Sequence, residues 1–433
     1  MLKPAKPLAL LLILAQCSLA WGHVAHPRKP LDLDLKQIEA LPAPGSMGET
    51  GERRHSVELP EIGDPSGTLF TPMQEQELGA AFFRSLHAQA EVNQDPEVSA
   101  YIQSIGQKLA ANSDNPAQPF HFFVVNDLAI NAFAGPGGYI GINTGLILVS
   151  EEESELASVL GHEIAHVTQR HLYQALQASG RIQMLSFVGM LAALLVGAKL
   201  GSAGSYQNQA YCTSKNEGCQ RPGNSGQGLA MAAMGAGTQA MINFTRDNEQ
   251  EADSVGMQTL ARSEFNPRSM PTFFERMQQS TRFAGHNMPE YLLTHPVTVS
   301  RIAETRDRAE KFPYRQYPDS MAYQLIRTKL RVASMRPAKE AVGYFRTASG
   351  QGVKQQQDVS RYGLALALIA DNRADEGKAL LQQLVAEYPA QSHFINALAK
   401  AEMDQRNYPK AMEIFAAARE RFPDNTAIRR FPG

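Results

Sequence analysis

The stretch Gly161–His171 (GHEIAHVTQRH) constrains the fold of this chain more than any other segment. It lies in a continuous helical pattern that we predict over residues 150–177, with Ser150 as the capping residue. Histidines four residues apart lie on the same side of a helix, and an intervening glutamate can point towards a water molecule held on a metal ion. The stretch therefore predicts two metal-binding imidazoles, His162 and His166, with Glu163 as a general base.

A metal site of this kind needs a third ligand. His171 follows His166 by five residues, about 140° further round a helix, so we expect it on the helix surface. Glu249 and Asp253 form an i, i+4 pair on another predicted helix. Glu249 can complete a His-His-Glu site, and Asp253 can hold the second nitrogen of a ligand histidine. Glu251 falls on another face, where we expect it to be solvated; an acidic helix surface is the alternative for the whole segment.

The N-terminus predicts export from the cytoplasm. Residues 1–22 combine Lys3 and Lys6, an unbroken apolar run and a small-x-small cleavage signal, as in a cleaved signal peptide. A lipid-modified Cys17 is the alternative, although Gln16 is a poor neighbour for it. Residues 23–70, rich in proline, glycine and charge, are predicted to be an extended lead-in.

Length and charge limit the remaining possibilities. A chain of 433 residues is too long for one core and predicts two or three domains. The net charge of −2 provides no basic field for a polyphosphate, so nucleic acid is excluded as the main partner. Helices are expected from Thr71-Pro72 and over 97–112, and strands over 121–127 and 139–150.

An apolar insertion is predicted over residues 183–242. Its two apolar segments are expected to form a helical hairpin or lid, or else two buried core helices, and the first segment is also suited to shallow membrane contact. Cys212 and Cys219 lie between the segments. In an exported protein, this pair predicts a disulfide that closes a small loop.

The C-terminal part repeats with a period of 34 residues. Pro389 recurs as Pro423, and the other repeated pairs are Ala365 with Ala399, Ala367 with Ala401, Leu381 with Phe415, and Tyr388 with Phe422. This period and pattern are typical of tetratricopeptide repeats, which stack into a superhelix that holds peptide or protein partners. Residues 338–348 suggest a degenerate earlier repeat, and an ordinary helical cap is the alternative for the region.

Four ordered motifs carry a resemblance to a known family. GHEIAHVTQRH, NAFAGPGG, RDNEQEADSVG and THPVTVSRI resemble the membrane-associated zinc peptidases that include HtpX and the CAAX prenyl endopeptidases. The resemblance implies a mostly α, gluzincin-type metallopeptidase domain with a small β-sheet over 71–315, followed by an α-solenoid of repeats over 320–433. It also implies one Zn²⁺ per chain, bound by His162, His166 and Glu249, with Glu163 as the base and Asp253 as a supporting carboxylate.

The resemblance also implies a biological role. With a signal peptide and C-terminal repeats, the chain is similar to periplasmic members that promote the assembly of outer-membrane β-barrel proteins and degrade misassembled ones. The repeats would then recruit the assembly machinery or its clients, and peripheral membrane contact stays open. The alternatives are an assembly adaptor or chaperone with a silent, autoinhibited metal site, and a general periplasmic quality-control protease.

Three further features gain a role in this context. Tyr139, Ile140 and Gly141 are expected on an edge strand that pairs with extended substrate, with an internal strand as the alternative. His295 and Arg301 are candidates for stabilising the oxyanion, and His295 is also a candidate for capping the zinc.

Overall fold

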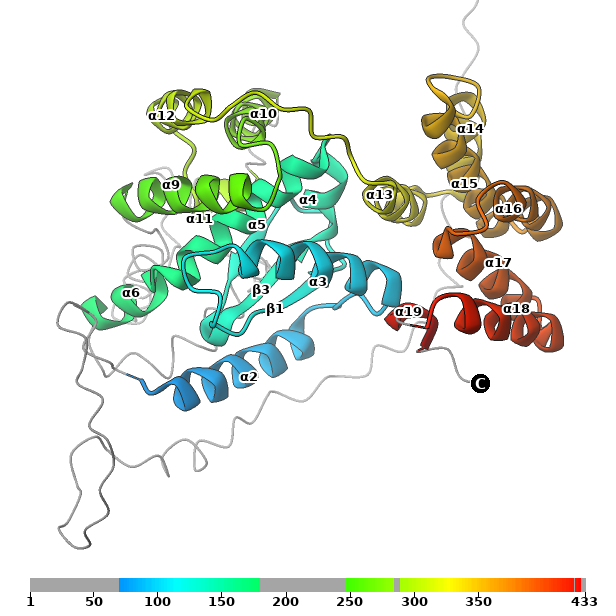
Figure 1. Cartoon of the computed structure of the whole chain (residues 1–433), viewed down its shortest axis with the longest axis horizontal. Coiled ribbons are helices and arrows are strands. Elements are labelled where there is room, and N and C mark those ends of the chain that lie inside the picture. The colour runs from blue at the N-terminus through cyan, green and yellow to red at the C-terminus, as the bar shows by residue number, and fades with distance from the viewer. Residues whose placement is uncertain (1–69, 180–245, 284–288, 424, 430–433) are drawn as a thin grey trace, which may run out of the picture. The chain divides into compact units, whose positions relative to one another are not determined.

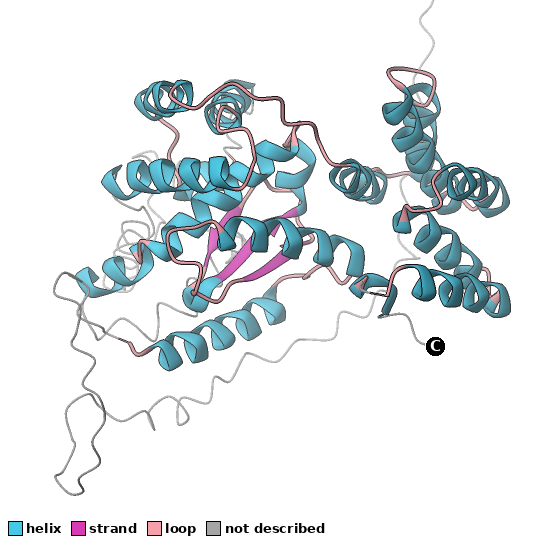
Figure 2. Ribbon diagram, in the orientation of Figure 1, coloured by secondary structure: helices cyan, strands magenta, loops and turns pink. Residues whose placement is uncertain are grey.

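The computed structural model describes residues 70–179, 246–283, 289–423 and 425–429 (Figure 1). Helices dominate these residues, and one small sheet accompanies them, which confirms the expected fold class (Figure 2). The export signal, the lead-in up to residue 69, the apolar insertion and the Cys212–Cys219 pair lie outside the described residues and stay predictions. No helix in the described ranges is both long enough and apolar enough to cross a membrane.

Both predicted N-terminal helices are confirmed, and so is Thr71 as the cap of the first. Helix α2 (Pro72–Gln89) begins after Thr71, whose hydroxyl accepts a hydrogen bond from the Gln74 backbone while the Gln74 side chain accepts one from the Thr71 backbone. Helix α3 (Pro96–Ala111) begins after Asp95, whose carboxylate accepts a hydrogen bond from the Glu97 backbone.

The sheet has three strands in the order β1-β3-β2: β1 (His121–Val125), β2 (Ala132–Ala134) and β3 (Tyr139–Asn143). Strand β3 pairs in parallel with β1 and antiparallel with β2. The expectation that Tyr139, Ile140 and Gly141 lie on an edge strand was wrong, because both sides of β3 are already paired. The edge strand next to the helix of the first motif is β2, which packs on that helix.

The predicted strand over 139–150 was too long. It ends at Asn143, and the apolar residues that follow form helix α4 (Thr144–Val149). A short apolar run without alternation fits a buried strand and a buried helix equally well, so periodicity could not separate them. Ser150 ends α4 and does not cap the next helix.

The predicted long helix over 150–177 is divided in two. Helix α5 (Glu153–Thr168) ends where Arg170 adopts a left-handed conformation with φ 59°, and helix α6 begins at His171 and ends at Ser179. The other described helices that precede the repeats are α9 (Arg246–Arg262), α10 (Ser269–Phe283), α11 (Glu290–Thr294) and α12 (Val299–Glu310).

Helices α5 and α9 pack side by side, and glycine allows their close approach (Figure 1). Gly161 of α5 faces Gly256 of α9. A Cβ atom on Gly256 would lie 3.0 Å from the Gly161 carbonyl group and from the His162 backbone nitrogen. Since these neighbours are backbone atoms, a side chain here would force the two helices apart.

The repeats follow as helix pairs: α13 (Met321–Ser334), α14 (Ala338–Ala348), α15 (Lys354–Ala370), α16 (Ala374–Glu387), α17 (Ser392–Asp404) and α18 (Tyr408–Arg421), with the short α19 (Thr426–Arg429). The repeated positions have equivalent environments. Leu381 and Phe415 are fully buried, while Tyr388 and Phe422 end α16 and α18. The predicted tetratricopeptide architecture is therefore confirmed.

Helix α13, although it begins the repeats, also packs into the apolar core that surrounds α5. This core contains residues of α3, α5, α9 and β3, together with three side chains of α13: Tyr323, Ile326 and Leu330. Polar contacts also join α3 to α13 and α17. The Lys329 ammonium lies 2.6 Å from a Glu97 oxygen, and the other Glu97 oxygen accepts a hydrogen bond of 2.9 Å from Asn396 of α17.

We expect Gly256→Ala to destabilise the protein by about 1–2 kcal/mol, since the new methyl group meets backbone atoms of α5. Gly343→Ala is the matched control, because a Cβ on Gly343 in α14 meets no atom within 4 Å. The control should be stabilising by up to about 1 kcal/mol through helix propensity alone. Urea unfolding of both variants measures the difference, and equal effects would show that the glycine contact carries no packing constraint.

Candidate metal centre

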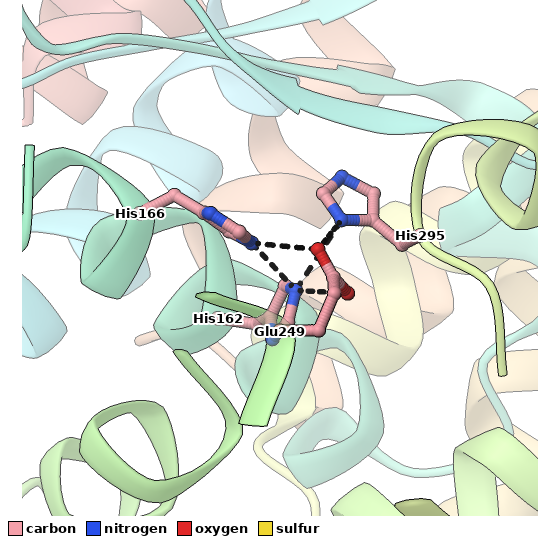
Figure 3. Close-up of side chains that lie close together, drawn as sticks. All are labelled: His162, His166, Glu249 and His295. Carbon is pink, nitrogen blue, oxygen red and sulfur yellow. Dashed lines mark hydrogen bonds and ion pairs between the residues drawn. The ribbon is translucent and has the colours of Figure 1, made fainter. Parts of the chain in front are cut away.

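Helix α5 places the three polar side chains of the first motif in a dry environment. His162, Glu163 and His166 are each at most 2% exposed. The Nε2 atoms of His162 and His166 lie 3.0 Å apart, so both imidazoles point to one place, as Figure 3 shows. This spacing follows from one turn of the helix.

Helix α9 brings two carboxylates to these imidazoles. Glu249 Oε1 lies 3.3 Å from His166 Nε2, and Glu249 Oε2 lies 3.5 Å from His162 Nε2 (Figure 3). One turn further, Asp253 Oδ1 lies 3.0 Å from His162 Nδ1, on the opposite edge of that ring. The predicted pair therefore contacts both ring nitrogens of His162: Glu249 lies next to Nε2 and Asp253 next to Nδ1.

His295 joins the same cluster from the end of α11. Its Nδ1 lies 3.0 Å from Glu249 Oε1 and 3.4 Å from His162 Nε2, and its Nε2 lies 3.5 Å from Glu163 Oε1. Four donor atoms, one each from His162, His166, Glu249 and His295, lie within 4.8 Å of one another. Three imidazoles and one carboxylate converging in a buried place suit a divalent transition metal.

The charges of the cluster are set by its neighbours. Burial raises the pKa of Glu249, but His295, His162 and His166 outweigh it and hold this pKa well below the usual range. Burial lowers the pKa of His162, yet hydrogen bonds to Asp253 and Glu249 raise it to about 9. Burial dominates at His166 and holds its pKa well below the usual value. Glu249 is therefore a carboxylate, as a metal ligand must be.

Glu163 has a different environment. Burial raises its pKa above the usual value, against the opposing effects of His295 and His162. The charged neighbour of its Oε1 is His295 Nε2, at 3.5 Å. A buried carboxylate with a raised pKa is suited to accept a proton and pass it on.

Arg301 supports the two carboxylates of α9. Its guanidinium donates to Asp253 through Nε (2.8 Å) and Nη2 (2.7 Å), while Nη1 lies 2.7 Å from Glu249 Oε2 and donates to the Pro296 carbonyl. The side chain is only 1% exposed. These contacts direct the guanidinium at carboxylates, so the geometry favours a positioning role over the predicted oxyanion role.

His171 was wrongly expected on a helix surface. It is fully buried, and its Nδ1 lies 2.9 Å from the Nδ1 of His166. The reason is the break between α5 and α6, which turns the chain so that the 140° argument for a continuous helix no longer applies. The sequence carried no glycine at this break that would have signalled it.

Comparisons with known proteins agree with this geometry. Residues 96–309 match Peptidase family M48, and residues 368–431 match the tetratricopeptide repeat. The chain is 34% identical to the beta-barrel assembly-enhancing protease of Yersinia pestis, over 82% of this chain and 68% of that protein. It is 33% identical to the protein of the same name from Escherichia coli (strain K12), over 84% and 70%.

A more distant similarity points to the same chemistry. The mitochondrial metalloendopeptidase OMA1 of Danio rerio is 27% identical over 58% of this chain and 49% of that protein. The buried histidine–carboxylate cluster and these relatives lead to one conclusion: the chain is a metallopeptidase that belongs to peptidase family M48, with similarity to the beta-barrel assembly-enhancing proteases.

Proposed function

We propose that this chain is an exported, zinc-dependent endopeptidase of a Gram-negative periplasm that promotes the assembly of outer-membrane β-barrel proteins and degrades misassembled ones. The observation that carries the enzymatic part is the convergence of His162, His166 and Glu249 next to Glu163, which lies on the same helix turn as the two histidines. The role in barrel assembly rests on the names of the relatives. The export signal over 1–22 supports the location.

The ligand set suits zinc. His162, His166 and Glu249 would bind one Zn²⁺ per chain, since two imidazoles and a carboxylate are a common catalytic zinc set. When bound, zinc lowers the pKa of a water molecule and polarises the substrate carbonyl group. Asp253 would hold the Nδ1–H of His162 and so keep its Nε2 directed at the ion.

Glu163 would move the proton. Its carboxylate would accept a proton from the attacking water and then give it to the leaving amine of the cleaved peptide bond. The raised pKa of Glu163 suits both steps, because the group must gain and lose a proton near neutral pH. An extended substrate would pair with the edge strand β2, which packs on α5.

The parts of the chain outside the centre complete the proposal. The peptidase domain would cover residues 71–315 and the repeats 320–433. The repeats would hold the assembly machinery or its clients, as stacked helix pairs commonly hold protein partners. The insertion over 183–242 would act as a lid or touch the membrane surface, with Cys212 and Cys219 joined in a disulfide.

A second candidate function is supported by His295. With its Nδ1 next to Glu249 and His162, this histidine would supply a fourth protein donor and fill the position that a catalytic site leaves open for water. The chain would then act mainly as an assembly adaptor or chaperone with a silent metal site. Displacement of His295 would convert this form into the active peptidase.

We expect Glu163→Gln to bind zinc as tightly as the parent and to lose at least about 100-fold in cleavage rate, because the proton carrier is gone and the ligands remain. The measurements are zinc content and cleavage of an unfolded outer-membrane β-barrel protein. An exposed acidic residue of α9 gives the matched control, Asp247→Asn, which should cleave like the parent. Equal cleavage by Glu163→Gln and the parent would remove Glu163 from the mechanism.

The same assay tests the substrate class. The parent should cleave the unfolded barrel protein in preference to an unrelated unfolded protein of similar length. Equal rates on both would favour a general quality-control protease.

We expect the His295→Ala variant to cleave several-fold faster than the parent. The substitution removes a capping donor, while His162, His166 and Glu249 remain to bind zinc. Single-turnover rates at saturating zinc provide the measurement. A fall in rate would instead assign His295 to stabilisation of the transition state.

A further inference from the structure

The ring of His166 has one edge in the metal centre and one edge outside it. Its Nε2 lies 3.0 Å from His162 Nε2 and 3.3 Å from Glu249 Oε1. Its Nδ1 lies on the other edge, 2.9 Å from Nδ1 of His171. Whatever holds this second edge decides which nitrogen of His166 offers its lone pair to an ion.

The turn between α5 and α6 places His171 at this edge. Arg170, in its left-handed conformation, reverses the direction of the chain directly before His171. The Arg170 guanidinium forms an ion pair with the largely buried Glu75 of α2 and lies over the Tyr173 ring, 4.8 Å from its centroid. These contacts fix the turn and hence the position of the fully buried His171.

The far edge of His171 meets a carboxylate of α9. His171 Nε2 lies 3.2 Å from Glu251 Oε2. The side chain of Glu251 is 53% exposed, whereas that of His171 is not exposed at all. Three side chains from α5, α6 and α9 therefore form an unbroken line from the metal centre to the surface.

The protons in this line have only one consistent arrangement. With the Nε2 lone pair of His166 directed at an ion, its Nδ1 carries the proton and donates to His171 Nδ1. His171 must then carry its proton on Nε2 and donate it to Glu251.

We propose that His171 and Glu251 form a positioning relay that fixes the ring orientation and tautomer of His166. The proposal rests on the metal site proposed above and deepens it. Helix α9 would then hold both ligand histidines: Asp253 directly through His162 Nδ1, and Glu251 indirectly through His171. In this arrangement His171 is neither a metal ligand nor a surface residue.

Two substitutions of His171 separate positioning from packing. His171→Leu keeps an apolar side chain of moderate size but cannot accept a hydrogen bond. His171→Asn places a carbonyl oxygen close to the position of the imidazole Nδ1 and can accept one from His166. We expect zinc affinity to fall about 10- to 100-fold in His171→Leu and to stay within about threefold of the parent in His171→Asn.

Zinc affinity is measured by competition with a chromophoric chelator, so the readout does not depend on catalysis. Parent-like affinity in His171→Leu would overturn the relay, and so would equal losses in His171→Leu and His171→Asn, which would indicate packing alone. Failure of the parent itself to bind zinc would instead overturn the proposed function.

Glu251 provides a second test that avoids the core. Glu251→Gln should weaken zinc binding by up to about threefold, as far as His171→Asn does, whereas Asp247→Asn, which removes a charge from the same helix at an exposed position, should leave it unchanged. In the His171→Leu background, Glu251→Gln should have no further effect, since the line is already interrupted. Additive losses, or equal losses in Glu251→Gln and Asp247→Asn, would contradict the relay.

Discussion

The contact between Gly161 and Gly256 sets the distance between helices α5 and α9, and the metal centre depends on that distance. The imidazoles come from one helix and Glu249 and Asp253 from the other, so their contacts of 3.0–3.5 Å exist only while the two backbones lie close together. The positions of the ligand side chains thus depend on two glycines, one directly before His162 in α5 and one three residues after Asp253 in α9.

Buried charge is the second constraint on this centre. Glu249, Asp253 and Arg301 are each at most 2% exposed, and such groups are tolerated only when they are paired. Arg301 neutralises part of the negative charge while leaving Glu249 Oε1 directed at the imidazoles. At Glu163 burial outweighs the opposing effects of His295 and His162, and its pKa is raised. Within one cluster, the pKa of Glu249 is therefore lowered and the pKa of Glu163 is raised.

The sequence predicted those features that depend on local periodicity. His162 and His166, and likewise Glu249 and Asp253, are four residues apart, so a regular helix is enough to place each pair on one face. The repeats were visible for the same reason, since their period is a property of the chain itself.

Features that depend on tertiary packing were not predictable. The helix is interrupted at Arg170, whose side chain contacts Glu75 and Tyr173. Glu75 is distant in the sequence, and Tyr173 lies in the helix that follows the turn, so neither contact could be predicted from a regular helical pattern. The order β1-β3-β2 places the third strand in the middle, which no pattern within Tyr139–Asn143 could indicate. Arg301 was recognised as functional, but its partners on α9 became apparent only with the fold.

The place of α13 limits how far this protein can be treated as two exchangeable modules. A chain shortened before Met321 would lose Tyr323, Ile326 and Leu330 from the core that surrounds α5 and would leave Glu97 without Lys329. Recombination between relatives would meet the same obstacle, and it could exchange repeats cleanly only beyond α13. The first helix of the scaffold is thus structurally part of the enzyme to which it is attached.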